Sequence, residues 1–324
     1  RAGEDVAAAD ASTAELNAVL DAAVRYLTVA EDETSVTAFN AALETRLELQ
    51  RVTHELVAQG LRPPIDEGRV QVEVDVARFD LMVAGYRLQQ DTVELSTALG
   101  LDPTTELRVE PIGDALVSVD DDPKRAAVAA EASRPELQAA RAQLAQSQAD
   151  IESARTARLP TLAVLAQGQA GHTEVLSGIG VAGRNESGQV GISLSIPVLD
   201  PVRSAQRTVA EKASVVAAER LRAARLAIRN DAVRAALAVR GSRALLQQAE
   251  RVRSGASANA ATARERYARG MTPVIDELIE AQARERSATS DAIRARLVLQ
   301  VACARLLASI GGAALVASVQ GDHR

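Results

Sequence analysis

The spacing of apolar residues divides the chain into long helical stretches and one short segment with a different period. Apolar side chains recur at helical intervals through stretches without interior proline, and this pattern predicts helices over residues 11–58, 65–99, 133–157, 201–269 and 274–310. The fourth begins at Pro201 behind a capping Asp200, and at 1.5 Å per residue it would be roughly 100 Å long. The sequence Ser133-Arg-Pro-Glu136 predicts a capping box at the start of the third.

Residues 160–199 alternate instead, which predicts a β-hairpin with strands over residues 161–170 and 190–198. One face is aliphatic and comprises Leu162, Val164, Val190, Ile192, Leu194 and Ile196. The other face is small and polar and includes Gln167, Gln169, Ser193 and Ser195. Each strand has the length of a tilted membrane-spanning strand, about 9–11 residues. The pattern fits a membrane barrel and a soluble hairpin packed on helices equally well.

An eight-residue motif occurs twice, as GLRPPIDE at residues 60–67 and as GMTPVIDE at residues 270–277. A glycine just past a helix can take the left-handed conformation that ends it, and proline suits the first turn of the next helix. Acidic residues in that turn interact favourably with the helix dipole. We therefore expect two tight turns between antiparallel helices, with Gly60 and Gly270 at the same end of the molecule.

The duplicated motif also organises the chain into segments. Residues 1–100 form a first, incomplete repeat, and residues 101–132 form a solvated connector that contains Asp120–Asp122 and three prolines. Residues 133–311 form the second repeat, which includes the hairpin at 160–199, and residues 312–324 form a tail. The helices after the two turns end alike, at Leu99-Gly100 and Ile310-Gly311, if one residue is inserted in the second copy.

Composition favours long helices that meet along narrow seams, because 47% of residues are hydrophobic but only 2% are aromatic. The net charge of -6, with no basic stretch interleaved with aromatics, argues against nucleic acid as a partner. Cys303 lies in an alanine- and leucine-rich run, where we expect it to pack in the core. Three scattered histidines, His54, His172 and His323, indicate no metal site, and no catalytic constellation or cofactor motif is present. We therefore expect no enzymatic activity.

Four phrases occur in a characteristic order: RPELQAA at 134–140, ARLPTL at 157–162, ISLSIPVLD at 192–200 and ERYARG at 265–270. Together with the turns they resemble the TolC-like outer-membrane efflux proteins, along nearly all of the second half and from about residue 22 in the first. The resemblance implies a mainly α fold, in which long antiparallel helical hairpins form a periplasmic α-barrel tunnel. A transmembrane β-hairpin from each repeat would contribute to a trimeric β-barrel.

The same resemblance implies a function and partners. It implies a passive exit duct in the outer membrane of a Gram-negative bacterium, serving a tripartite efflux pump or a type I secretion system. The partners would be two further copies in a homotrimer, a periplasmic adaptor protein, an inner-membrane transporter and outer-membrane lipid. The aliphatic hairpin face would meet lipid and the polar face would line the barrel lumen. The counterpart hairpin of the first repeat would precede Arg1, so we expect an N-terminally truncated chain.

In this family the turns form the periplasmic tip, where the tunnel closes and the adaptor binds. The positions that carry over to this role are Gly60, Arg62, Asp66, Tyr267, Arg269, Gly270 and Asp276. We expect Tyr267 to bond Asp66 in a wet site, and Arg62 or Arg269 to replace an arginine where Thr272 stands. The alternative is that Asp66 and Asp276 only favour helix N-termini. The alternative function is a soluble periplasmic coiled-coil adaptor or scaffold, although the flanking small β-domain of an adaptor is not found.

Overall fold

The computed structural model describes residues 2–109, 119–157, 159–173, 183–196, 201–271 and 275–312. They fall into two compact units. One unit comprises Arg1–Val6 and Gln138–Ala223, and the other comprises Ala7–Leu137 and Ala224–Arg324. We call the first the hairpin unit, because it contains the β-strands, and the second the helical unit.

The chain is mainly helical, as predicted. In order, the elements are α1 (Ala2–Ala58), α2 (Ile65–Ala98), α3 (Pro123–Ser133), α4 (Pro135–Thr156), β1 (Thr161–Thr173), β2 (Gly183–Ser195), α5 (Pro201–Ala268) and α6 (Asp276–Ser309). Helix α1 begins at Ala2, earlier than predicted, because alanine favours the helix even where large apolar residues are absent. Helix α5 has 68 residues, which gives it the expected length of roughly 100 Å. Among the described helices, none is long and apolar enough to cross a bilayer.

Helix α3 lies almost entirely within residues 101–132, where a solvated connector with at most a short strand was expected. The side chain of Asp122 accepts a hydrogen bond from the main-chain N–H of Lys124 at 3.0 Å, and Pro123 occupies the first helical position. Both residues are helix-start signals, but the proline and the acidic run were interpreted as marks of a loop. One face of this helix is buried and consists of Ala126, Ala127 and Ala130.

The predicted capping box at Ser133 is wrong. Ser133 is the last residue of α3, and its hydroxyl oxygen lies 2.8 Å from the carbonyl oxygen of Ala129 and 2.6 Å from that of Ile310, so its one proton can bond to either. Arg134 between α3 and α4 is extended, since a residue before proline avoids the helical conformation. The serine therefore joins α3 to the end of α6 instead of opening α4.

Strands β1 and β2 pair antiparallel in one two-stranded sheet. Leu162 pairs with Leu194 and Val164 with Ile192, so the predicted aliphatic residues of the two strands share a face. Both strands extend farther toward their connecting loop than predicted. Strand β2 ends at Ser195, two residues before a proline that could not donate to the sheet. Ile196 lies just past the strand, and residues 197–200, which include the rest of the predicted strand and Asp200, lie outside the described residues.

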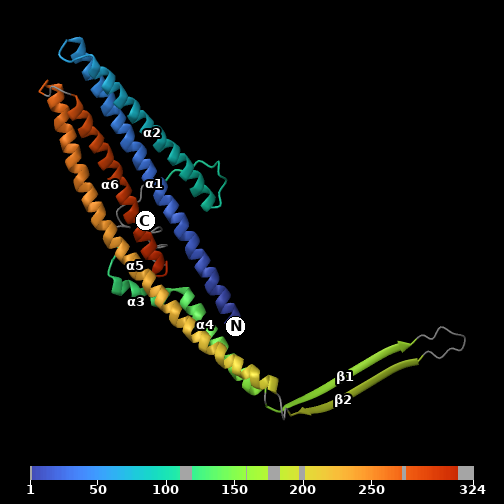
Figure 1. The fold of residues 1–324 in the computed structure, drawn as a ribbon. Coiled ribbons are helices and arrows are strands. Elements are labelled where there is room, and N and C mark those ends of the chain that lie inside the picture. Colours follow the sequence, from blue (N-terminus) through green and yellow to red (C-terminus); the bar gives the residue numbers. More distant parts are fainter. Residues whose placement is uncertain are drawn as a thin grey trace, which may run out of the picture. The chain divides into compact units, whose positions relative to one another are not determined.

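The two repeat turns begin with the same backbone conformation, as the duplicated motif predicts. Gly60 and Gly270 have φ values of 70° and 71°. In each turn the glycine N–H donates three residues back and the next N–H donates five residues back, a Schellman motif; all four bonds are 2.9–3.0 Å long. Both turns lie at the same end of the helical unit, as predicted (Figure 1).

The far ends of the two hairpins match as well. Helices α2 and α6 each have 34 residues and end before Gly100 and Gly311, which have φ values of 70° and 103°. A Cβ at Gly311 would lie 2.5 Å from the Ser133 side chain, so only glycine fits there. The offset between helix starts, Ile65 and Asp276, is 211, whereas the offset between turn glycines is 210. The two motifs align residue for residue, so α6 begins one motif position later than α2: Ile65 is helical and the matching Ile275 is not.

Candidate functional site at the paired turns

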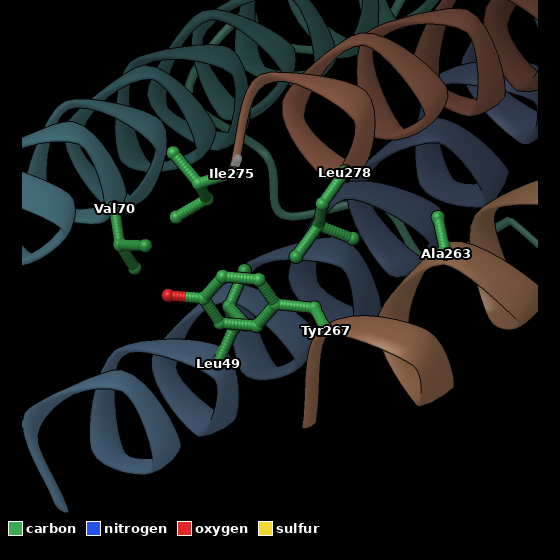
Figure 2. Packing of buried hydrophobic residues seen from close by; sticks show 6 residues of the cluster. All are labelled: Leu49, Val70, Ala263, Tyr267, Ile275 and Leu278. Atoms are coloured by element: carbon green, nitrogen blue, oxygen red, sulfur yellow. The ribbon is translucent and has the colours of Figure 1, made fainter. Parts of the chain in front are cut away.

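Tyr267, in the last turn of α5, is fully buried and is the centre of the core beside the turns. Figure 2 shows its ring among side chains contributed by four helices: Leu49 of α1, Val70 of α2, Ala263 of α5, Leu278 of α6, and Ile275 just before α6. The phenolic oxygen points away from Ala263 and toward the helix that carries Val70 (Figure 2). One ring thus packs both repeats together next to their turns.

The polar edge of this core ties the two turns to each other. The Tyr267 hydroxyl donates to Oδ2 of Asp66, at 3.3 Å, as predicted. Arg62 Nη2 donates to the main-chain oxygen of Tyr267 at 3.0 Å, and its Cζ atom lies 4.3 Å from the centre of the Tyr267 ring. Arg62 therefore combines a cation–π contact with a bond to the C-terminal end of α5, where cations are favourable.

The site is buried, so the expectation of a wet site is wrong. Asp66 is 3% exposed and Arg62 is 8% exposed. Burial raises the pKa of Tyr267 above its ordinary value, and the charge of Asp66 raises it further. The phenol consequently keeps its proton and acts as the donor. A buried carboxylate depends on its donors more than an exposed one, because lost donors are not replaced by water.

Arg269 and Asp276 lie outside this cluster. Arg269, the residue after α5, pairs with Glu265 of that helix and is exposed. Of the two arginines expected to replace the one absent at Thr272, only Arg62 therefore contacts Tyr267. Asp276 is 65% exposed and pairs with Arg69 of α2 at 2.7 Å. The matching aspartates of the two motifs therefore have different surroundings. Both lie in the first turn of a helix, so a dipole contribution applies to both.

Sequence reasoning missed Arg69 and two further polar contacts between α1 and α2 near the turn. Gln50 Nε2 donates to Gln71 Oε1 at 2.6 Å, and His54 Nδ1 lies 2.9 Å from Glu67 Oε1. A hollow of about 500 Å³ adjoins these contacts. No sequence signal pointed to them, because each joins residues on two different helices and neither pair repeats in the second motif.

The hairpin exposes both of its faces within a single chain. The predicted aliphatic residues are 57–78% exposed, with Val190 the highest and Ile196, just past β2, the lowest. On the opposite face Gln167 pairs with Gln189 and Ala163 with Ser193. The predicted division into an aliphatic and a polar face is confirmed, except that Leu165 lies among the polar residues. Such an uncovered aliphatic face is a surface for lipid or protein contact.

A second apolar surface runs along α2. Its exposed residues follow the 7-3-4-7 spacing of a coiled-coil seam and are Val72, Phe79, Met82, Tyr86 and Val93. They are 45–70% exposed, so nothing in the described part of the chain covers this stripe. A seam of this kind is typical of a helix that packs against another helix.

Comparisons with known proteins point to one family. A family model described as outer membrane efflux protein matches residues 126–312. No curated protein matches the chain. Among solved structures, the outer-membrane channel OprN is 21% identical with a TM-score of 0.75, over 96% of this chain and 69% of that one. The open state of the MtrE outer membrane channel of Neisseria gonorrhoeae is 20% identical with a TM-score of 0.75, over 96% of this chain and 69% of that one.

VceC of Vibrio cholerae gives 15% identity and a TM-score of 0.73, over 95% of this chain and 72% of that one. At these identities the similarity establishes the fold, and it confirms the predicted class of long helical hairpins with a small β-element.

Proposed function

Because the chain belongs to the outer membrane efflux protein family, we propose that it is the exit duct of a tripartite efflux pump or a type I secretion system. As a member of this family it is an outer-membrane channel protein and not an enzyme. In the proposed role it lets substrates leave the periplasm passively. Energy would come from an inner-membrane transporter, joined to the duct by a periplasmic adaptor protein.

The exposed hairpin supports a place in a membrane barrel. Its aliphatic face would meet lipid, and Gln167, Gln169, Ser193 and Ser195 would line the lumen. Two strands alone leave unpaired backbone groups at both edges, which a bilayer does not tolerate. Further strands are therefore required, and other copies of the chain can supply some of them.

The apolar stripe on α2 supports a homotrimer. In a helical tunnel each hairpin has helical neighbours on both sides, and those at the edge of a protomer must come from another copy. Residues at coiled-coil spacing, such as Phe79, Met82 and Tyr86, suit that contact because they leave water when a neighbouring helix packs on them.

The contacts among Arg62, Asp66 and Tyr267 are the single observation that carries the proposed gate. They join the two hairpins where their turns meet, and both turns begin with a glycine of the same conformation. We assign the resting closure of the tunnel to these contacts, with Arg69 and Asp276 as an exposed second pair. The exposed surface around Gly60, Gly270 and Arg269 is the proposed adaptor contact.

Single-channel conductance tests the gate. Tyr267→Phe removes the phenol donor and Asp66→Ala removes its acceptor, and the double variant should raise the resting conductance of the full-length protein in planar bilayers. Because symmetry multiplies each contact threefold, even a loss of about 1 kcal/mol per protomer should be visible. Cells that carry this variant should also become more sensitive to large antibiotics.

Asp276→Ala is the matched control, because it removes an exposed aspartate next to the same turns. It should change cation preference more than closure. If the double variant assembles into trimers and conducts like the wild type, these residues only pack the helix ends and the gate lies elsewhere.

The alternative of a soluble adaptor is not supported, because the family model identifies the chain as an outer membrane efflux protein. Membrane fractionation separates the two, because a duct sediments with outer membranes and needs detergent for extraction. The uncovered aliphatic hairpin face favours the duct.

A further inference from the structure

A second buried polar site lies in the helical unit, around Arg46 of α1. Arg46 is 5% exposed, yet within the described residues its guanidinium has one hydrogen bond, from Nη2 to the main-chain oxygen of Gln282 at 3.5 Å. A guanidinium offers five N–H donors and stays protonated in proteins. Buried charges are normally paired, so this cation has fewer partners than its burial requires.

Arg46 borders a hollow between α1, α5 and α6 with a volume of about 200 Å³. Alanines of α1 between residues 38 and 42 form one wall, and their short side chains leave this space. Two further arginines border the same hollow, Arg264 of α5 and Arg286 of α6. Three arginines from three helices therefore line one hollow.

The carboxylates beside Arg264 and Arg286 form only long ion pairs with them. Arg264 Nη2 lies 3.8 Å from Glu285 Oε1, and Arg286 Nη1 lies 3.5 Å from Asp80 Oδ2. Charge-assisted bonds are shorter, about 2.7–2.9 Å. Glu285 is the acidic residue that borders the hollow, so the lining carries two more positive than negative charges.

The charge around Arg46 is otherwise mixed. Burial lowers the pKa of Arg46, while the charges of Glu73 and Glu285 act to raise it and those of Arg264 and Arg286 act to lower it. An anion in the hollow would offset both the burial and the repulsion among the three arginines.

We infer that this pocket binds a small oxyanion, a phosphate or a carboxylate group, with Arg46 as its main ligand and Arg264 and Arg286 beside it. The planar guanidinium matches two oxygens of such a group. The volume limits the ligand to a small group, because pockets for drug-sized molecules hold roughly 300–1,000 Å³. The bound anion would join α1 of the first repeat to α5 and α6 of the second.

This inference does not depend on the duct proposal, and thermal unfolding of the purified protein tests it directly. Inorganic phosphate at constant ionic strength and pH 7 should raise the melting temperature of the wild type saturably, since a ligand that binds only the folded state stabilises it. Arg46→Gln should raise the phosphate concentration that gives half of this stabilisation about tenfold or more, because a charge-assisted bond is lost.

Phosphate also stabilises proteins non-specifically by exclusion from their surface, so a matched variant is needed. Arg78→Gln makes the same change on α2 at an exposed arginine that pairs with Asp75, and it should respond like the wild type. Glu285→Gln should lower the phosphate concentration needed for the same stabilisation, because it removes the carboxylate that competes for the arginines. Acetate in place of phosphate distinguishes a carboxylate ligand from a phosphate ligand.

An identical, non-saturating response to both anions in the wild type and in Arg46→Gln would overturn the proposal. If Arg46→Gln does not fold, Arg286→Gln serves as the test variant, because its side chain is 37% exposed and its loss leaves the core packed. An unchanged phosphate response in a folded Arg286→Gln protein would also overturn it.

Discussion

Charged side chains are buried at three points of the helical unit, and each point accommodates them differently. Asp66 accepts a bond from Tyr267, Arg46 borders the proposed anion pocket, and Asp32 of α1 lies against Asp91 of α2. Asp32 is 6% exposed, and its Oδ2 atom is buried without a hydrogen-bond partner among the described residues. Burial of a charge is costly, so these positions should respond strongly to protonation or substitution.

The carboxyl group of Asp32 should titrate near neutral pH. Burial raises its pKa to about 7, and the hydrogen bond with Asp91 and the charges of Asp91 and Glu31 act in the same direction, against Arg87. Burial raises the pKa of Glu31 as well, opposed by Ser35, Arg294 and Arg87. Two carboxyl groups can share a hydrogen bond only when one of them holds a proton.

Asp32 should therefore make stability decrease as the pH rises toward 7. Between about pH 4 and pH 7 the folded protein holds a proton that the unfolded chain releases, so the free energy of unfolding falls by at most about 1.4 kcal/mol per pH unit from this group. Asp32→Asn resembles the protonated form. It should be more stable than the wild type in urea unfolding at pH 8 and nearly equal to it at pH 4.

The difference between the two proteins isolates Asp32 from other groups that titrate in this range, such as the histidines. A constant difference from pH 4 to pH 8 would contradict the assignment of a raised pKa.

Glycines set where the helices end, and their effect depends on backbone conformation. Gly60 has a φ of 70° and Gly68, in the first turns of α2, has a negative φ; a Cβ added at either residue would have no atom within 4 Å. The two residues therefore differ in backbone conformation and not in available space.

We expect Gly60→Ala to destabilise the protein by about 1–2 kcal/mol, because an L-residue is strained in the left-handed region. Gly68→Ala, its matched control, should stabilise by up to about 1 kcal/mol, since alanine is the better helix former. Urea unfolding of both variants measures the two effects. Equal changes of the same sign would show that the conformation of Gly60 does not control the turn.

The hairpin can function only as part of a larger assembly, because a two-stranded sheet is marginal in water and has open edges in lipid. The assignment of its faces predicts how neighbouring residues of β2 tolerate charge. Ile192 lies on the aliphatic face and Ser193 on the opposite one, and both side chains are exposed in the single chain.

Ile192→Arg should hinder assembly in the outer membrane, since an arginine facing lipid costs about 2–4 kcal/mol near the bilayer midplane. Ser193→Arg should assemble and instead alter the conductance of the pore, because it faces the proposed lumen. The amount of detergent-resistant trimer in outer-membrane fractions measures assembly. Equal loss of trimer in both variants would argue against a lipid face and a lumen face.

Features with a local cause could be predicted from the sequence. The glycine and proline signals at residues 60–67 and 270–277 define the turns, and the alternation near residues 161 and 192 defines two faces of a hairpin. The length of α5 followed from the absence of interior proline. Each of these depends on residues a few positions apart, so the sequence by itself determined them.

The tertiary structure alone decided which polar residues are buried. Asp66 and Asp276 occupy the same place in the duplicated motif, yet Asp66 is the second residue of α2 and Asp276 is the first residue of α6. Asp66 lies against Tyr267, whereas Asp276 is exposed beside Arg69. Likewise Arg46 resembles many other arginines in the sequence, and Ser133 resembles a helix cap. Their surroundings depend on residues about 180–240 positions away, brought together by helix packing.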